Sequence, residues 1–336
     1  MKKIFSLVLV SLLLLMSFAA FAEDGEVLVL YASRTEPYLT NTVNQFTEAT
    51  GIEVEVVSAG TAELQKRIEA EGDEPLGDVM LGGMMYGSYL PMDDYWMDYD
   101  SPLNDTLPAD AQCIAGSIYG FSYVGSCLMI NNAMLEELGI EVNGYQDLLQ
   151  PELKGKIVMP DPTQTSSGWE QLVNILYAMG DGDPDAGWDF VRQLMENGMV
   201  LTSGSSASHK AVADGEYAVG LVCEAMVTTY IEEGMDIGLV WMEEGVIMNC
   251  DGIAAIKNCK HPESAKAFVD FLISEEYQNL LLAETPQVRP VLSDLDTELK
   301  LTPIDEINVI SCDYDYISTN KDAILEQMKD IMTDYL

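Results

Sequence analysis

Hydrophobic and polar positions along the first part of the chain follow a pattern typical of strands that alternate with helices. Short apolar, β-branched runs predict buried strands at residues 27–31, 52–57 and 79–81. Between these runs, apolar side chains recur at helical spacing over residues 38–50 and 62–70. Strands that alternate with helices through short loops favour an α/β fold with a parallel sheet.

A second series of the same kind begins near Lys156. It predicts further strands and a helix at residues 157–159, 169–179, 215–221 and 253–256. One long helical pattern then covers residues 261–284, and residues 321–336 form an amphipathic helical pattern. The chain has 336 residues, more than one hydrophobic core usually serves, so two domains are expected.

The first 22 residues carry the pattern of a secretory signal peptide. Lys2 and Lys3 precede an apolar run over residues 4–18, and Ala20-Phe21-Ala22 supplies small residues for cleavage. The apolar run is short for a membrane span, which favours cleavage over anchoring. No cysteine follows the predicted cut, so a lipid anchor is not expected. The mature chain is expected to be exported, most simply to a periplasm.

The composition is strongly acidic, with 16 basic residues against 56 acidic ones and a formal net charge of −40. Nucleic acid is therefore a poor candidate partner, because such binding depends on Lys and Arg that neutralise phosphates. Self-repulsion at this charge favours a soluble monomer. Two alternatives stay open for the six cysteines, which could pair in an oxidising compartment or act as small core residues. They are Cys113, Cys127, Cys223, Cys250, Cys259 and Cys312.

Small and hydroxyl-bearing residues follow several predicted strands. In open α/β sheets, ligands bind beyond the carboxyl ends of the strands, so the loops at 32–35, 58–61 and 82–83 are expected to face a ligand. The N-terminus of a helix offers unpaired N–H groups and partial positive charge to a phosphate. The candidate ligand-binding residues are Ser33, Arg34, Ser58, Gly60, Thr61, Gly82, Gly83, Thr165, Ser166, Ser167, Ser205, Ser206, His209 and Glu224.

Each candidate also has a plain structural alternative. Ser58 and Thr61 could simply cap a helix, and Ser166-Ser167 could do the same. Arg34 could grip a phosphate with its two-pronged guanidinium, or it could pair with a surface carboxylate. His209 could belong to an ordinary surface loop.

Other motifs argue against a metal site and against catalysis. Alternating aspartates at 180–187 suggest a calcium loop, but the required glycine and terminal glutamate are absent. Asp183-Pro184 instead predicts a helix start, with proline in the first turn. A hydrolase would need a nucleophile beside a base, and the chain has two histidines and no GxSxG motif. We therefore expect no enzyme activity, no metal and no cofactor.

Six segments in order resemble a known family: VLVLYASRTEP, EATGIEVEVVSAGTAEL, GDVMLGG, PELKGKIVMPDPTQTSSG, ADGEYAVGL and HPESAKAFVDFLISEEYQ. They are similar to family 1 of the extracellular (periplasmic) solute-binding proteins of ABC importers. Within this family, the chain resembles the branch that holds ferric-iron, hexose-phosphate and 2-aminoethylphosphonate binders.

The resemblance implies a two-lobed, type II periplasmic-binding-protein fold. Each lobe would be a mostly parallel sheet flanked by helices, and strand crossovers would form a hinge. After a signal peptide at 1–22, residues 23–124 and 249–285 would form lobe 1, and residues 125–248 and 286–336 would form lobe 2. The resemblance also implies a small solute, a membrane permease and an ATPase as partners.

The identity of the ligand depends on the residues after the strand predicted at 215–221. The ferric binders of this branch resemble one another in two adjacent tyrosines there, and phenolates suit a hard trivalent cation. This chain has Cys223-Glu224-Ala225-Met226 instead, and its nearest tyrosine is Tyr230. An anionic, phosphorylated solute is therefore the favoured ligand, with ferric iron or a sensor role for a receptor kinase as alternatives.

Glu224 would suit the far end of such a solute. Its carboxylate could accept hydrogen bonds from sugar hydroxyls or pair with an ammonium group. A hexose phosphate and an aminophosphonate differ at this end, and both stay open.

Overall fold

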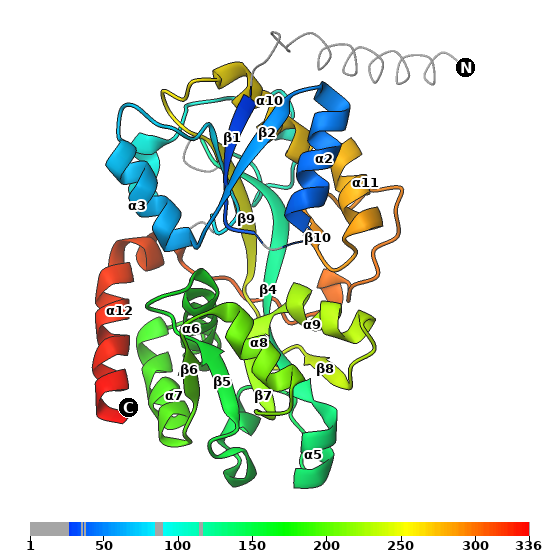
Figure 1. The fold of residues 1–336 in the computed structure, drawn as a ribbon. Helices are drawn as coiled ribbons and strands as arrows, with labels where there is room; N and C mark the ends of the chain where they lie inside the picture. The colour runs from blue at the N-terminus through cyan, green and yellow to red at the C-terminus, as the bar shows by residue number, and fades with distance from the viewer. Residues whose placement is uncertain (1–26, 35, 37, 85–89, 114–116, 336) are drawn as a thin grey trace.

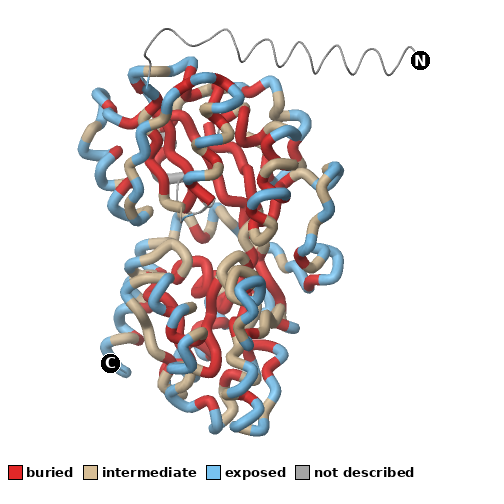
Figure 2. The backbone as a smooth tube through the Cα atoms, turned by 45° about the vertical axis from the view of Figure 1, so that its right-hand side comes forward, coloured by how far each residue is buried: buried red, intermediate tan, exposed pale blue. Residues whose placement is uncertain are grey.

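The computed structural model describes residues 27–34, 36, 38–84, 90–113 and 117–335. The predicted signal peptide and Thr35, which belongs to one predicted loop, lie outside these residues. Figure 1 shows two bodies of strands and helices, one above the other, which we call the first and second lobes. In Figure 2 the buried backbone runs mainly along the strands at the centre of each lobe.

The first lobe is built on a parallel core of three strands. Its elements are β1 (Val27–Ala32), β2 (Glu53–Ser58), β3 (Val79–Leu81), α2 (Tyr38–Thr50), α3 (Thr61–Glu71), α10 (Pro262–Ile273) and α11 (Glu275–Glu284). β1 pairs in parallel with both β2 and β3. Apolar side chains of β1 share one buried core with α2 and α10. In this core the Phe46 ring of α2 lies 4.6 Å from the Phe268 ring and 5.5 Å from the Phe271 ring of α10. The predicted parallel arrangement is confirmed here.

The second lobe repeats this design with its own core. Its elements are β5 (Ile157–Pro160), β6 (Val200–Thr202), β7 (Val219–Cys223), β8 (Ile237–Val240), α5 (Asn132–Leu138), α6 (Ser166–Met179), α7 (Pro184–Glu196), α8 (Ser205–Ala213), α9 (Glu224–Glu232) and α12 (Tyr314–Tyr335). β5 pairs in parallel with β6 and β7. α12 runs along the outside of this lobe beside α7 (Figure 1). Asp183 caps α7 and Pro184 opens it, as predicted.

Two long strands join the lobes. β4 (Tyr119–Asn131) pairs antiparallel with β9 (Met248–Ala255) along its first half and with β7 along its second half. The two strands therefore run from one lobe into the other at the centre of Figure 1. Through β9 and β4 the lobes share one ten-stranded sheet, in the order β2-β1-β3-β9-β4-β7-β5-β6, with β8 and β10 (Arg289–Pro290) paired to β4. These crossovers confirm the predicted fold class.

Short 3₁₀ turns complete the described chain. They are η1 (Leu90–Tyr95), η2 (Asn104–Thr106), η3 (Gln146–Leu149), η4 (Pro151–Leu153) and η5 (Ile304–Glu306). No helix among the described residues combines the length and the apolar character that a membrane crossing requires. Three of the cysteines, Cys127, Cys250 and Cys259, are buried in the apolar cores.

Several predicted elements need correction. The single helical pattern over 261–284 is two helices, because Ser274 has extended backbone (φ −75°, ψ 150°) and its side chain accepts a hydrogen bond from the Tyr277 N–H. The strand predicted at 215–221 begins only at Val219, and the last helix begins at Tyr314 rather than Lys321. β4 was not predicted, because polar and glycine positions such as Ser122, Gly125 and Ser126 interrupt its apolar pattern.

The predicted division of the chain between the lobes stays a prediction. Within it, β10 was assigned to lobe 2, yet Arg289 and Pro290 pair with Tyr123 and Ser122 on the part of β4 that pairs with β9. Val291, the next residue, packs in the core of the first lobe. We propose that the first lobe extends past β10.

Candidate ligand-binding site

One cavity between the lobes brings together most of the predicted site residues. It has a volume of about 470 Å³. Twelve of the fourteen predicted residues line it, namely Ser33, Arg34, Gly60, Thr61, Gly83, Thr165, Ser166, Ser167, Ser205, Ser206, His209 and Glu224. Ser58 is exposed at the end of β2, outside the lining. Gly82 is buried behind Arg34, and a Cβ atom at Gly82 would lie 2.8 Å from the Arg34 Cγ.

Four helices begin at this cavity. α3, α6, α8 and α9 contribute their first residues to its lining. The N-cap residues of α3, α8 and α9 make no capping hydrogen bond through a side chain. The α6 N-cap differs, because the Thr165 hydroxyl accepts from the Gly168 N–H at 3.0 Å. Three helix starts therefore lack a side-chain acceptor of their own, so N–H groups there are available to an anion.

Hydroxyl groups connect these helix starts. The Ser33 and Thr61 hydroxyl oxygens lie 2.8 Å apart, and the Thr61 hydroxyl donates to that of Ser166 across the cavity at 3.4 Å. On the second-lobe side, the hydroxyls of Ser167 and Ser205 are hydrogen-bonded to each other. Thr61 thus faces the cavity and the opposite lobe instead of capping its own helix. The same cluster offers donors to a ligand oxygen without adding net charge.

Arg34 pairs with a carboxylate, as in its structural alternative, but this carboxylate is buried and lines the cavity instead of lying at the surface. Its Nη2 lies 2.5 Å from the Asp251 carboxylate and donates to the Ser122 hydroxyl at 2.8 Å. Its guanidinium carbon lies 5.1 Å and 5.0 Å from the ring centroids of Tyr38 and Phe121. Its Nε is buried and makes no hydrogen bond with the described residues. The guanidinium is therefore held in one orientation and keeps an N–H group unused.

Glu224 has a partner that was not predicted. Arg289 in β10 donates to both of its carboxylate oxygens, from Nε at 3.1 Å and from Nη2 at 2.7 Å. Both side chains are buried. Burial raises the pKa of Glu224 and Arg289 opposes this shift. Because both Arg289 bonds end on carboxylate oxygens, we treat Glu224 as an ionised partner of Arg289.

Glu170 is a third buried acid in the lining and was also not predicted. Its carboxyl accepts a hydrogen bond from the Asn249 amide, and the Asn249 oxygen accepts from the Tyr314 hydroxyl at 3.2 Å. Burial raises the pKa of Glu170 to about 8, although the nearby Lys321 opposes the shift. Glu170 is therefore largely protonated at neutral pH.

His209 lies on α8 with its ring toward Tyr230. The His209 Nδ1 and the Tyr230 hydroxyl are 3.0 Å apart, and burial lowers the pKa of His209. The other histidine, His261, is bound through its Nδ1 to the buried Asp78, 2.9 Å away. His261 does not line the cavity.

The missed residues carried only weak signals in the sequence. Glu170 stands in the apolar register of the helix predicted at 169–179, where an acid is unusual. Arg289 is one of few basic residues in a very acidic chain. Asp251 lies two residues before a predicted strand, as do many surface residues. Each becomes significant only because the fold brings it to the cavity.

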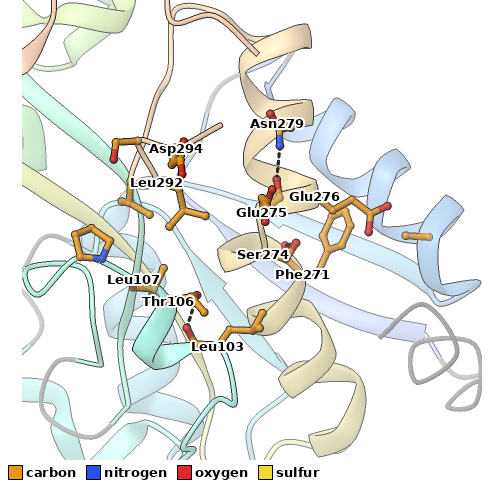
Figure 3. A pocket seen from close by; sticks show the side chains of 14 residues that line it. Leu103, Thr106, Leu107, Phe271, Ser274, Glu275, Glu276, Asn279, Leu292 and Asp294 are labelled. Atoms are coloured by element: carbon orange, nitrogen blue, oxygen red, sulfur yellow. Dashed lines mark hydrogen bonds between the residues drawn. The ribbon is translucent and has the colours of Figure 1, made fainter. Parts of the chain in front are cut away.

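A second and larger hollow of about 830 Å³ lies on the first lobe, between the start of α11 and the segment at 291–294 (Figure 3). Phe271 and Leu292 are among the apolar side chains that line it. It also contains a helix start, but the Ser274 side chain caps this helix by accepting a hydrogen bond from the Tyr277 N–H. This hollow therefore lacks the features that make the inter-lobe cavity suitable for an anion.

Comparisons with known proteins show the family of this chain and its fold. A family model described as "Bacterial extracellular solute-binding protein" matches residues 41–302. The "Iron uptake protein A1" of Synechocystis is 24% identical over 284 residues, which cover 79% of this chain and 75% of that protein. The "Spermidine/putrescine-binding periplasmic protein" of Escherichia coli is 23% identical over 266 residues, which cover 76% of this chain and 75% of that protein.

Solved structures of similar fold include the periplasmic binding protein AfuA from Actinobacillus pleuropneumoniae, described with fructose-6-phosphate bound. Its TM-score to this chain is 0.81 at 22% identity, and the match covers 92% of this chain and 99% of AfuA. At this identity the likeness concerns the fold.

Proposed function

We propose that this chain, which belongs to the family of bacterial extracellular solute-binding proteins, captures a small phosphorylated solute between its lobes. The role of this family is substrate capture for an ABC transporter rather than catalysis. We further propose that the chain is exported through a cleaved signal peptide. It then delivers the solute to a permease and ATPase in the membrane.

The observation that carries the proposal is the convergence of helix starts and hydroxyls on one cavity. The starts of α3, α8 and α9 lack side-chain caps, and Ser33, Thr61, Ser166, Ser167 and Ser205 surround them. A phosphate oxygen bound there would accept N–H and O–H donors in a site partly shielded from water, where such bonds are strong. The cavity, at about 470 Å³, suits a metabolite of small size.

The charges of the cavity favour an anion over ferric iron or a polyamine, ligands suggested by the names of two relatives. A hard cation needs anionic oxygen ligands that are free to bind it. In this cavity the carboxylates of Asp251 and Glu224 are each paired with an arginine, and Glu170 is largely protonated at neutral pH. Binding a cation there would require breaking these pairs.

Calorimetric titration of the mature protein tests the proposal, after unfolding and refolding to remove any copurified ligand. We expect binding of a hexose phosphate and no comparable binding of ferric citrate or spermidine. Thr61→Val should weaken binding of the phosphate by about tenfold, since it removes a hydroxyl donor to a charged group. Ser58→Ala is the matched control, because this hydroxyl lies outside the cavity, and it should leave binding unchanged.

Two results would contradict the proposal. One is that inorganic phosphate, glycerol phosphate and hexose phosphates all fail to bind the refolded protein. The other is that ferric citrate binds more tightly than every phosphorylated compound.

A further inference from the structure

The cavity contains acidic side chains that would ordinarily attract a cation. Among the described residues that line it, Glu170, Glu224 and Asp251 carry carboxyl groups. An ammonium group on a ligand would need at least one of them as a partner, because a buried unpaired charge is costly. Whether such a partner is available decides which phosphorylated solutes the cavity accepts.

Asp251 has both oxygens occupied. Its Oδ2 lies 2.5 Å from the Arg34 Nη2. Its Oδ1 accepts from the backbone N–H groups of Met84 at 2.9 Å and Gly252 at 3.0 Å. Its side chain is only 4% exposed. A ligand ammonium could reach this carboxylate only by displacing Arg34.

Glu224 is occupied in the same way, by a residue from the other lobe. Arg289 donates to both of its oxygens, and the Arg289 Nη2 donates as well to the Thr302 carbonyl at 2.8 Å. The side chains of Glu224 and Arg289 are 5% and 2% exposed. A buried pair of this kind is costly to break by removing one partner, because the other charge is left uncompensated.

Glu170 is occupied by a neighbouring side chain as well. It is buried and accepts a hydrogen bond from the Asn249 amide. Burial also raises its pKa, which disfavours the ionised form that an ammonium group would need as a partner.

Gln171 offers a neutral acceptor near Glu224, because its amide bonds to the carbonyl of Val222, two residues before Glu224. It lies next to Glu170 on α6, is 1% exposed and lines the cavity. Its Nε2 donates to the Val222 carbonyl at 2.7 Å, which fixes the amide, and its Oε1 accepts no hydrogen bond from the described residues. A buried acceptor without a partner is costly, so a ligand hydroxyl that donates to it would be stabilised.

We propose that Arg289 closes the Glu224 end of the cavity to ammonium groups, and that Gln171 accepts a ligand hydroxyl there, so that the protein selects hydroxylated phosphate or phosphonate esters and acids over their amino counterparts. This inference rests on the proposed function. Arg289 acts as a specificity-determining residue through Glu224, and Gln171 through direct contact with the ligand.

The test compares two ligands that differ in one group, 2-hydroxyethylphosphonate and 2-aminoethylphosphonate, by calorimetry on the full mature protein. A hexose phosphate is titrated in parallel. For the wild type we expect the hydroxyl compound to bind about tenfold more tightly or better, the scale of one charge left without a partner. In Arg289→Gln, which frees the Glu224 carboxylate, this ratio should fall by about tenfold. Arg289→Lys keeps a cation beside Glu224 and should retain the preference of the wild type.

A variant of Gln171 provides a second measurement. Gln171→Met has a similar volume and lacks the acceptor, so it should lower affinity for 2-hydroxyethylphosphonate several-fold, and by more than it lowers affinity for 2-aminoethylphosphonate. Thermal unfolding of each variant verifies that it is folded.

The inference is overturned if the wild type prefers 2-aminoethylphosphonate, a result that needs no variant. An unchanged preference in folded Arg289→Gln would also overturn it. So would an equal loss of affinity for 2-hydroxyethylphosphonate and 2-aminoethylphosphonate in Gln171→Met. These outcomes leave hexose phosphate binding intact, whereas failure of the proposed function would show as loss of hexose phosphate binding in the wild type.

Discussion

At the scale of single residues, the cavity is built from charges that neutralise one another. Arg34 with Asp251 and Arg289 with Glu224 form two buried ion pairs, each held by further hydrogen bonds. Buried pairs of this kind contribute little net stability, but they orient their members. The unused Nε of Arg34 is positioned in this way. The site therefore resembles a set of oriented dipoles more than a patch of positive charge.

Glu170 leads to a prediction about pH. Its pKa is raised from 4.5 to about 8 in the folded protein by burial, with Asp251 adding to the shift and Lys321 and Asn249 opposing it. The folded state thus retains a proton that the unfolded chain releases. This contribution to stability is fully present below pH 4.5 and is lost as the pH rises to about 8. Each unit of pKa shift corresponds to about 1.4 kcal/mol.

Glu170→Gln should therefore show a smaller loss of unfolding free energy than the wild type across this window. Urea unfolding of both proteins at several pH values measures the difference, which cancels the contribution of other titrating groups. Parallel curves for the two proteins would contradict the proposed protonation of Glu170.

At the scale of elements, the turn after β3 explains how the start of α3 comes to face the second lobe. Gly82 and Gly83 both have left-handed backbone, with φ values of +77° and +65°. A Cβ atom at Gly83 would lie 2.3 Å from the Thr61 Oγ1. The turn can approach Thr61 this closely only because Gly83 lacks a side chain. Thr61 in turn contacts Ser33 and Ser166.

Gly83→Ala should consequently lower the free energy of unfolding by about 1–3 kcal/mol, through left-handed strain and the contact with Thr61. Gly60→Ala is the matched control, since Gly60 has φ −66° and a Cβ there meets nothing within 4 Å. It should cost at most about 1 kcal/mol, the preference for Gly over Ala at an N-cap, because it adds neither strain nor a close contact. Chemical denaturation measures both, and equal losses would contradict this account.

At the scale of the whole molecule, the net charge of −40 acts against an anionic ligand only from a distance. The cavity itself combines paired charges, hydroxyls and helix starts. Long-range repulsion is screened by salt, while contacts inside a partly enclosed cavity are screened much less. Entry and final binding should therefore respond differently to ionic strength.

We expect the association rate constant of a phosphorylated solute to rise as salt is increased, because the Debye length falls from about 30 Å at 0.01 M to about 8 Å at 0.15 M. The dissociation rate constant should change much less. Stopped-flow measurement of both constants tests this. An association rate that falls with salt would mean that the entrance to the cavity is locally positive.

The sequence by itself determined most of the local features of this protein. The positions of β1, β3 and α2, the loops beside α3 and α6, and twelve residues of the cavity lining follow from short patterns of apolar, small and hydroxyl-bearing residues. Such features depend on neighbours in the chain, because helix starts and buried strands have local signatures.

Only the tertiary structure decided how these features combine. The partners Glu224 and Arg289 are 65 residues apart, and Arg34 lies in the loop after β1 whereas Asp251 lies on β9, so neither pair has a signature in the chain. The crossover β4 was hidden because its two halves pair with different strands and carry polar residues. Whether a carboxylate is free or occupied is a property of packing, and this occupancy underlies the selectivity that we propose.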